Sequence, residues 1–110
     1  MAKKDSAPRN ITSQDAAKTN TPAKLNSKNR NTLEAIFENP VRSDIDWDDI
    51  ERLFVALGGI VDNKRKGSRV GVSIRGVKAL FHEPHPNPET DKGAVQSVRE
   101  YLRRCGIYPL

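Results

Sequence analysis

The chain has 110 residues, 35% of them hydrophobic, with 19 Lys and Arg against 14 Asp and Glu. This length allows one small domain, and the mean hydropathy of -0.69 is low enough to predict that part of the chain is unfolded. The single cysteine, Cys105, excludes an intramolecular disulfide and a cysteine zinc site, and no apolar run is long enough to span a membrane, so we expect a cytoplasmic protein.

Residues 1–30 differ in composition from the remainder. They are rich in Ala, Ser, Thr, Asn, Lys and Pro and have no apolar periodicity, which predicts a disordered tail followed by a folded domain over residues 31–110. Up to Thr32, seven basic residues stand against two acidic ones, a difference of five that equals the formal net charge. A basic arm of this kind either contacts RNA or DNA phosphates nonspecifically or keeps the protein soluble.

Two helices are predicted in the next stretch. An i, i+3, i+4 spacing of apolar residues predicts a short helix over Thr32–Glu38, which ends before Pro40. Asp46 is the expected N-cap of a longer helix from Trp47 to about Leu57, with Gly58 or its neighbour as the stop. The apolar stripe of this longer helix consists of Ile50, Leu53, Phe54 and Leu57.

Three strands are predicted to follow. Gly59–Asp62 is short, whereas Arg69–Ile74 alternates between apolar and polar residues along its length. Arg75-Gly76 is a tight turn, and Val77–Phe81 returns with the same alternation. The residues expected to face the core are Val70, Val72, Ile74, Val77, Ala79 and Phe81.

A last helix is predicted over Asp91 to about Cys105, with Thr90 as its cap and Gly106 as its stop. Its inward face consists of Ala94, Val95, Val98, Tyr101 and Leu102. Helix, three strands and helix make an α+β fold, an α-β-β-β-α sandwich in which two helices cover one face of a three-stranded antiparallel sheet.

Three motifs in this region occur in a recognisable order. Leu57-Gly58-Gly59 closes the first sandwich helix, Gly67-Ser68-Arg69 opens the hairpin, and His85 precedes the Lys92–Val98 segment, which reads KGAVQSV. From about Asp44 to Ile107 the chain thereby resembles HicA-type toxins, small ribonucleases of toxin–antitoxin pairs. The resemblance implies a fold similar to double-stranded-RNA-binding domains.

The resemblance also implies a function. HicA-type toxins are mRNA interferases, endoribonucleases that a cognate antitoxin protein from an adjacent gene neutralises. Their catalytic histidine ends the Gly-Ser-His motif, and this sequence has Arg69 at that position. Two functions therefore stay open: a toxin that binds mRNA and cleaves it, or a catalytically inactive RNA-binding or antitoxin-binding module of the same fold.

RNA cleavage without a metal ion requires a base for the 2′-hydroxyl, an acid for the leaving oxygen and a cation for the charged phosphorane. Histidine fits the first two roles because its pKa lies near neutrality. Arginine fits the third, since its planar fork matches phosphate oxygens. We therefore predict His85 as the acid or base, Arg69 as the transition-state clamp and Lys92 as a phosphate contact.

His82 alternates out of phase with Phe81 and is predicted to face solvent, away from the core. Two histidines three residues apart can ligate a metal, but no third ligand is evident beside His82 and His85, so we predict neither a metal nor another cofactor.

Basic residues and glycines also gather where the hairpin and the last helix begin. Glycine lets a phosphate approach the backbone closely, and the amides of a helix start can reach the same anion. The cluster is either an ordinary solvated charged turn or a surface that reads the shape and backbone of RNA. The predicted RNA-binding residues are Lys64, Arg65, Lys66, Gly67, Ser68, Lys92 and Gly93.

Overall fold

A computed structural model describes residues 25–63, 67–84 and 88–109. Leu25, inside the stretch expected to be a disordered tail, is buried. Helix α2 spans Ser27–Ile36, so it starts inside the stretch expected to be a disordered tail. Asn26 caps this helix, because its Oδ1 accepts a hydrogen bond from the Asn29 N–H at 2.8 Å. The expected helix over Thr32–Glu38 overlaps the second half of α2, which ends at Ile36.

Helix α3 spans Trp47–Ala56 and follows the predicted course, with Asp46 as its N-cap residue. Strand β2, Ile45–Asp46, immediately precedes it and pairs antiparallel with β6, Glu89–Thr90. These two-residue strands were not predicted, because so short a pairing leaves no periodicity in the sequence. They join the start of α3 to the start of the last helix.

The main sheet consists of β3 (Ile60–Asp62), β4 (Arg69–Ile74) and β5 (Val77–His82), in the order β3-β4-β5. All pairings are antiparallel, as predicted. Arg75 and Gly76 form the turn between β4 and β5 with φ values of 54° and 80°. Two consecutive left-handed residues are typical of a hairpin turn that matches the twist of its strands.

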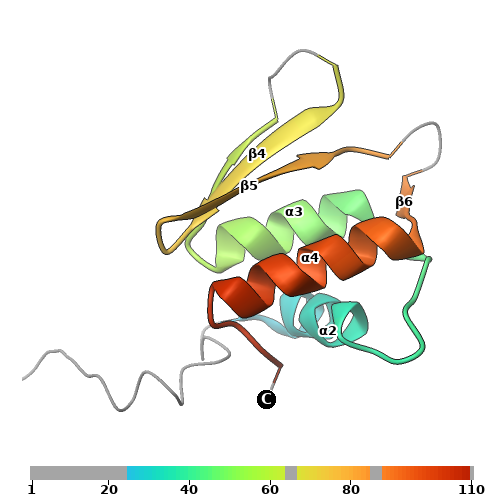
Figure 1. Ribbon diagram of the computed structural model, residues 1–110. Coiled ribbons are helices and arrows are strands. Elements are labelled where there is room, and N and C mark those ends of the chain that lie inside the picture. The colour runs from blue at the N-terminus through green and yellow to red at the C-terminus, as the bar shows by residue number, and fades with distance from the viewer. Residues whose placement is uncertain (1–24, 64–66, 85–87, 110) are drawn as a thin grey trace, which may run out of the picture.

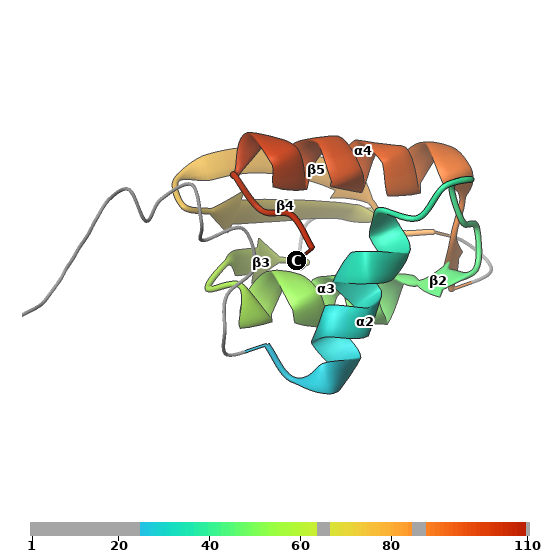
Figure 2. The same ribbon diagram turned by 90° about the horizontal axis from the view of Figure 1, so that it is seen from below.

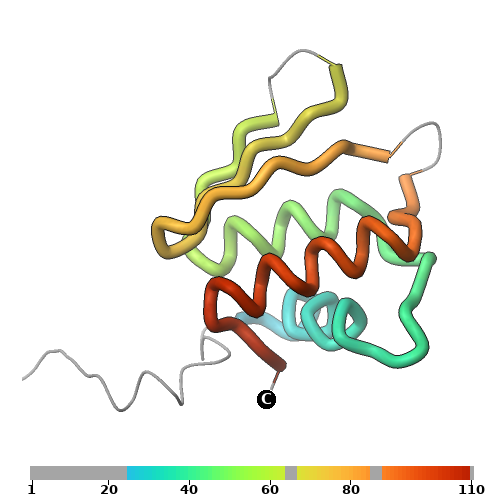
Figure 3. The backbone as a smooth tube through the Cα atoms, in the orientation of Figure 1, coloured from blue at the N-terminus to red at the C-terminus, as the bar shows by residue number. Residues whose placement is uncertain are grey.

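Helix α4 spans Lys92–Arg104 and lies antiparallel to β5 (Figure 3). The prediction that Thr90 caps it was wrong. Asp91 is the cap, and its Oδ1 accepts a hydrogen bond from the Ala94 N–H at 2.7 Å. Thr90 is fully buried instead, opposite Ile45 in the small β2–β6 sheet.

The predicted α+β sandwich is confirmed, with one addition. Figure 1 shows α3 and α4 side by side on one face of the β3-β4-β5 sheet. Helix α2 crosses the other side of this helix pair as a third layer (Figure 2). The apolar stripes of α3 and α4 and the inner face of the sheet form one core, in which Phe54, Phe81 and Tyr101 contact one another through their rings.

Arg99 joins α2 to α4. It is 8% exposed, and its guanidinium donates to Ile36 O at 2.8 Å, Glu38 O at 2.6 Å and Asn39 Oδ1 at 3.3 Å. It also lies 5.8 Å from the centroid of the Phe37 ring. A cation at the end of a helix interacts favourably with the helix dipole, so Arg99 holds the C-terminal end of α2 against α4.

Candidate functional site

The predicted site residues fall into three groups. Lys64, Arg65, Lys66 and His85 lie outside the described residues. Gly67 and Ser68 precede β4, Gly67 with a φ of 72°, and Arg69 is the first residue of that strand. Lys92 and Gly93 form the first turn of α4, and both are exposed.

Arg69 lies directly opposite His82 in the β4–β5 register. Beyond this pair, the Glu83 N–H donates to Ser68 O at 2.7 Å. Hydrogen-bonded and non-hydrogen-bonded pairs alternate along an antiparallel ladder, so Arg69 and His82 form a non-hydrogen-bonded pair, the kind whose side chains approach most closely. Both residues are exposed, and no described residue forms a side-chain hydrogen bond or ion pair with either of them.

His82 is thus the site residue that the sequence interpretation missed. The expectation that it faces solvent is confirmed, but its position opposite Arg69 was not foreseen. A signal was present, because a two-residue turn at Arg75-Gly76 fixes the register of both strands. Counting outward from that turn brings position 69 opposite position 82.

A groove of about 570 Å³ runs between β5 and α4. His82 and Gly93 lie on its two walls at the end where α4 begins, while Lys92 does not line it. His82 at the hairpin end and Gly93 at the helix start therefore meet at this groove. Its lining residues are Ala79, Leu80, Phe81, His82, Asp91, Gly93, Ala94, Ser97, Tyr101 and Arg104.

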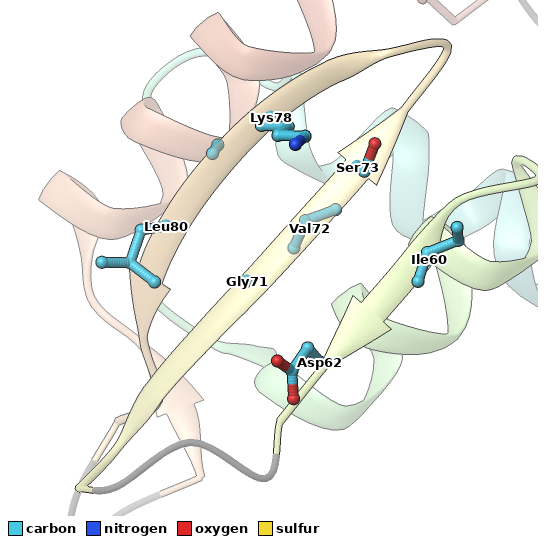
Figure 4. A pocket seen from close by; sticks show the side chains of 8 residues that line it. Ile60, Asp62, Gly71, Val72, Ser73, Lys78 and Leu80 are labelled. Atoms are coloured by element: carbon cyan, nitrogen blue, oxygen red, sulfur yellow. The ribbon is translucent and has the colours of Figure 1, made fainter.

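The outer face of the sheet carries a second, shallower hollow of about 480 Å³ (Figure 4). Gly71 and Ser73 on the central strand form its floor, because they have little or no side chain. Ile60 and Leu80, 73% and 49% exposed, stand on the flanking strands. Exposed apolar side chains around a hollow mark a surface suited to another molecule.

The turn end of the same hairpin is held by α4. The Ile74 N–H donates to Tyr101 Oη at 3.0 Å, and Tyr101 Oη donates to Val77 O at 2.6 Å. The Arg75 guanidinium donates to Cys105 O at 3.0 Å. Burial raises the pKa of Tyr101 to about 12, and burial also raises the pKa of the Cys105 thiol. A thiol in that state is a poor nucleophile, so Cys105 belongs to the core.

The described residues include no group of three His, Cys, Asp or Glu side chains placed to hold a metal ion. Nor does any helix in the described ranges have the length and apolar character needed to cross a membrane.

Residues 47–107 match the family described as HicA toxin of bacterial toxin-antitoxin. This match covers α3, the β3-β4-β5 sheet and α4, more than half of the chain, and it begins after α2. No curated protein and no solved structure matches the chain.

Proposed function

The chain belongs to the HicA toxin family and is a toxin of a toxin–antitoxin system, and from this premise we propose that it binds mRNA and cleaves it without a metal ion. The observation that supports the proposal best is the cross-strand pair of Arg69 and His82. An arginine fork and an imidazole side by side on an exposed sheet end supply the cation and one of the proton-transfer groups that this reaction needs.

In the proposed reaction the imidazole of His82 accepts the proton of a ribose 2′-hydroxyl. The 2′-oxygen then attacks the adjacent phosphorus, and the bond from phosphorus to the 5′-oxygen breaks. A second acid gives that oxygen its proton, and the products are a 2′,3′-cyclic phosphate and a free 5′-hydroxyl. Arg69 stabilises the negative charge that develops on the phosphorane, a contribution of about 10²–10³ in rate for comparable groups. We assign the acid role to His85, which lies outside the described residues.

RNA binding would use the residues around this pair. Gly67 and Ser68 leave the backbone accessible beside Arg69, and the first turn of α4 offers the Gly93 amide on the far wall of the groove. The predicted basic residues 64–66 come directly before Gly67 in the sequence. Binding through such contacts is expected to weaken steeply with salt, because each phosphate contact releases counterions.

One observation also favours an antitoxin-binding surface on the same domain. The hollow over Gly71 lies on the sheet face that Arg69 and His82 share, and Ile60 and Leu80 border it with exposed apolar side chains. A cognate antitoxin seated there would cover the proposed cleavage site. The alternative function, a catalytically inactive RNA-binding or antitoxin-binding module, needs only these contacts and no proton transfer.

Cleavage of RNA by the purified full chain in the presence of a metal chelator tests the proposal. We expect products that end in 2′,3′-cyclic phosphate, and we expect His82→Asn and His85→Asn each to remove cleavage while RNA binding persists. The wild-type chain binding RNA without cutting it would favour the inactive module. Cleavage that requires a divalent metal would contradict the proposed mechanism.

Induction of the same variants in a bacterium gives an independent readout. Wild-type protein should arrest growth and degrade transcripts, and His82→Asn should do neither at equal expression. Unimpaired growth with intact transcripts under wild-type induction would count against an RNA-cleaving toxin. Co-expression of the protein encoded by an adjacent gene should restore growth if that protein is the antitoxin.

A further inference from the structure

The groove between β5 and α4 continues well past the Arg69–His82 pair. One face of α4 lines it from end to end, with Gly93, Ala94 and Ser97 near His82 and Arg104 at the other end. At 1.5 Å per residue, Gly93 and Arg104 lie roughly 16 Å apart along the helix axis. The groove is therefore longer than a site for one phosphate group needs to be.

The opposite wall is the outer edge of β5. No described strand pairs with this edge, since β5 is the last strand of its sheet. The Glu83 N–H points toward β4, so by alternation Lys78, Leu80 and His82 direct their backbone N–H and C=O groups away from β4. The groove thus has hydrogen-bonding backbone on one side and, on the other, the small residues Gly93, Ala94 and Ser97 followed by Tyr101 and Arg104.

Arg104 has no carboxylate partner in the described part of the chain. Its guanidinium lies 5.6 Å from the centroid of the Tyr101 ring, which holds it in place without neutralising it. The adjacent Arg103 differs, because it forms an ion pair with Glu100 at 2.7 Å and does not line the groove. The only carboxylate in the groove lining, that of Asp91, lies at the opposite end and accepts the Ala94 N–H as the helix cap.

We propose that this groove holds an unpaired RNA strand that extends from the cleavage position at Arg69 and His82, and that Arg104 binds one of its phosphates. The inference rests on the proposed function and adds to it a path and a second anchoring point. An uncompensated guanidinium matches a phosphate oxygen pair, and a row of backbone amides suits a polyanion. A protein strand added to the β5 edge is the competing occupant, and it has no need of the Arg104 charge.

Binding of single-stranded RNA of increasing length to the full chain tests the path. Arg104→Gln should weaken binding of an oligonucleotide of about ten residues and lower the salt slope of its affinity by about 0.7, the value for one phosphate contact on a single strand. For a dinucleotide, which is too short to reach from His82 to Arg104, wild type and variant should bind equally. Arg103→Gln is the matched control and should change neither quantity.

A second pair of variants tests the groove without changing Arg104: one variant obstructs the groove and the other is its control. Ser97→Glu adds bulk and negative charge inside the groove, whereas Gln96→Glu adds the same charge at an exposed position of α4 outside it. Only Ser97→Glu should weaken binding of the long oligonucleotide, and thermal unfolding of both variants checks that each is folded.

Different results would overturn the RNA path along the groove and the proposed function itself. If wild-type protein binds RNA and Arg104→Gln behaves as Arg103→Gln at every length, the path is wrong while the proposed function stands. The same result joined to a loss of antitoxin binding in Ser97→Glu would assign the groove to a protein strand. If wild-type protein binds no RNA at low salt, both the path and the proposed function are overturned.

Discussion

The two ends of the β4–β5 hairpin differ in how their polar groups are used. At the turn end, Tyr101 and Arg75 make hydrogen bonds that tie the hairpin to the last turn of α4. At the open end, Arg69 and His82 face each other on an exposed surface, and their side chains form no hydrogen bond or ion pair with a described residue. The turn end of the hairpin, called the fastened end below, is hydrogen-bonded to α4. The other end exposes side chains to which no described residue is hydrogen-bonded.

The turn end of the hairpin therefore stabilises the fold, whereas the open end carries the side chains proposed for the reaction. Because two-residue turns fix register, fastening the turn end also fixes which residues oppose each other at the far end. Arg69 and His82 can then stay opposite each other without a side-chain hydrogen bond or ion pair to any described residue. A site residue with no structural partner is free to bind substrate, and its replacement should leave the fold intact.

Arg69→Ala is expected to have the largest effect. If Arg69 stabilises the phosphorane, RNA cleavage should fall about 10²–10³-fold while the free energy of unfolding changes by less than about 0.5 kcal/mol. Single-turnover cleavage and urea denaturation measure the two quantities. Arg69→Lys keeps the charge but loses the fork, so we expect it to recover only part of the activity. Full RNA cleavage by Arg69→Ala would show that Arg69 takes no part in the reaction.

Tyr101→Phe probes the fastened end. Tyr101 is 1% exposed, and loss of its hydroxyl leaves the Ile74 N–H and the Val77 carbonyl without their partner. We expect a loss of about 1–3 kcal/mol in the free energy of unfolding, measured by urea denaturation. Binding of a dinucleotide should change little. An unchanged stability would mean that the turn end is not held by this hydroxyl.

Alkaline pH should loosen the fastened end in the wild-type protein. The pKa of Tyr101 is raised by burial from 10.0 to about 12, so the neutral hydroxyl is favoured in the folded state. The stability that this provides is complete below pH 10 and is lost as the pH rises from 10 to 12. Denaturation curves across this range should decline more steeply for wild type than for Tyr101→Phe. Parallel declines would contradict the assignment.

Asp91→Ala tests the helix start beside the open end. Its carboxylate caps α4, and replacement of such a cap by alanine typically costs about 1 kcal/mol. Asp91→Asn is the matched control, since asparagine caps helices about equally well. Thermal unfolding separates the two variants. Equal losses in both would show that the charge of Asp91, rather than its capping bond, stabilises α4.

Arg75→Gln should have the smallest effect. Its guanidinium donates to the carbonyl of Cys105 at the end of α4, a part-buried interaction with the helix dipole worth about 0.3–1 kcal/mol. The free energy of unfolding from urea titration should fall by that amount, and less at high salt. A loss as large as that of Tyr101→Phe would show that Arg75 stabilises the turn end as strongly as the buried hydroxyl does.

Most of the domain fold could be predicted from sequence because its elements repeat with a clear period. Apolar residues alternate along β4 with the two-residue period of a strand, and they recur along α3 and α4 with the spacing of a helix face. The start of α2 could not be predicted in this way, because its first turn is polar and resembles the tail before it. Asn26 was the available signal for a helix start, as a capping residue before the apolar positions.

The site was harder to predict than the fold, since it depends on contacts between distant residues. Arg69 was identified by its place in a motif, but its partner His82 follows only from the strand register. Arg104 lies outside every motif and enters the groove because α4 runs antiparallel to β5. Lys92, predicted as a phosphate contact, is exposed at the start of α4 but does not line the groove, so its role stays a prediction.

The acceptors of Arg99 all precede residue 47, where the match to the toxin family begins. A fragment cut at that boundary would keep the guanidinium but lose every oxygen that it binds, and removing the partners of a buried charge is strongly destabilising. The segment that matches the family, residues 47–107, is therefore expected to be less stable by itself than with α2 present. We therefore predict that a fragment of residues 25–110 unfolds at a higher temperature than a fragment of residues 47–110, and thermal unfolding of the two fragments tests this.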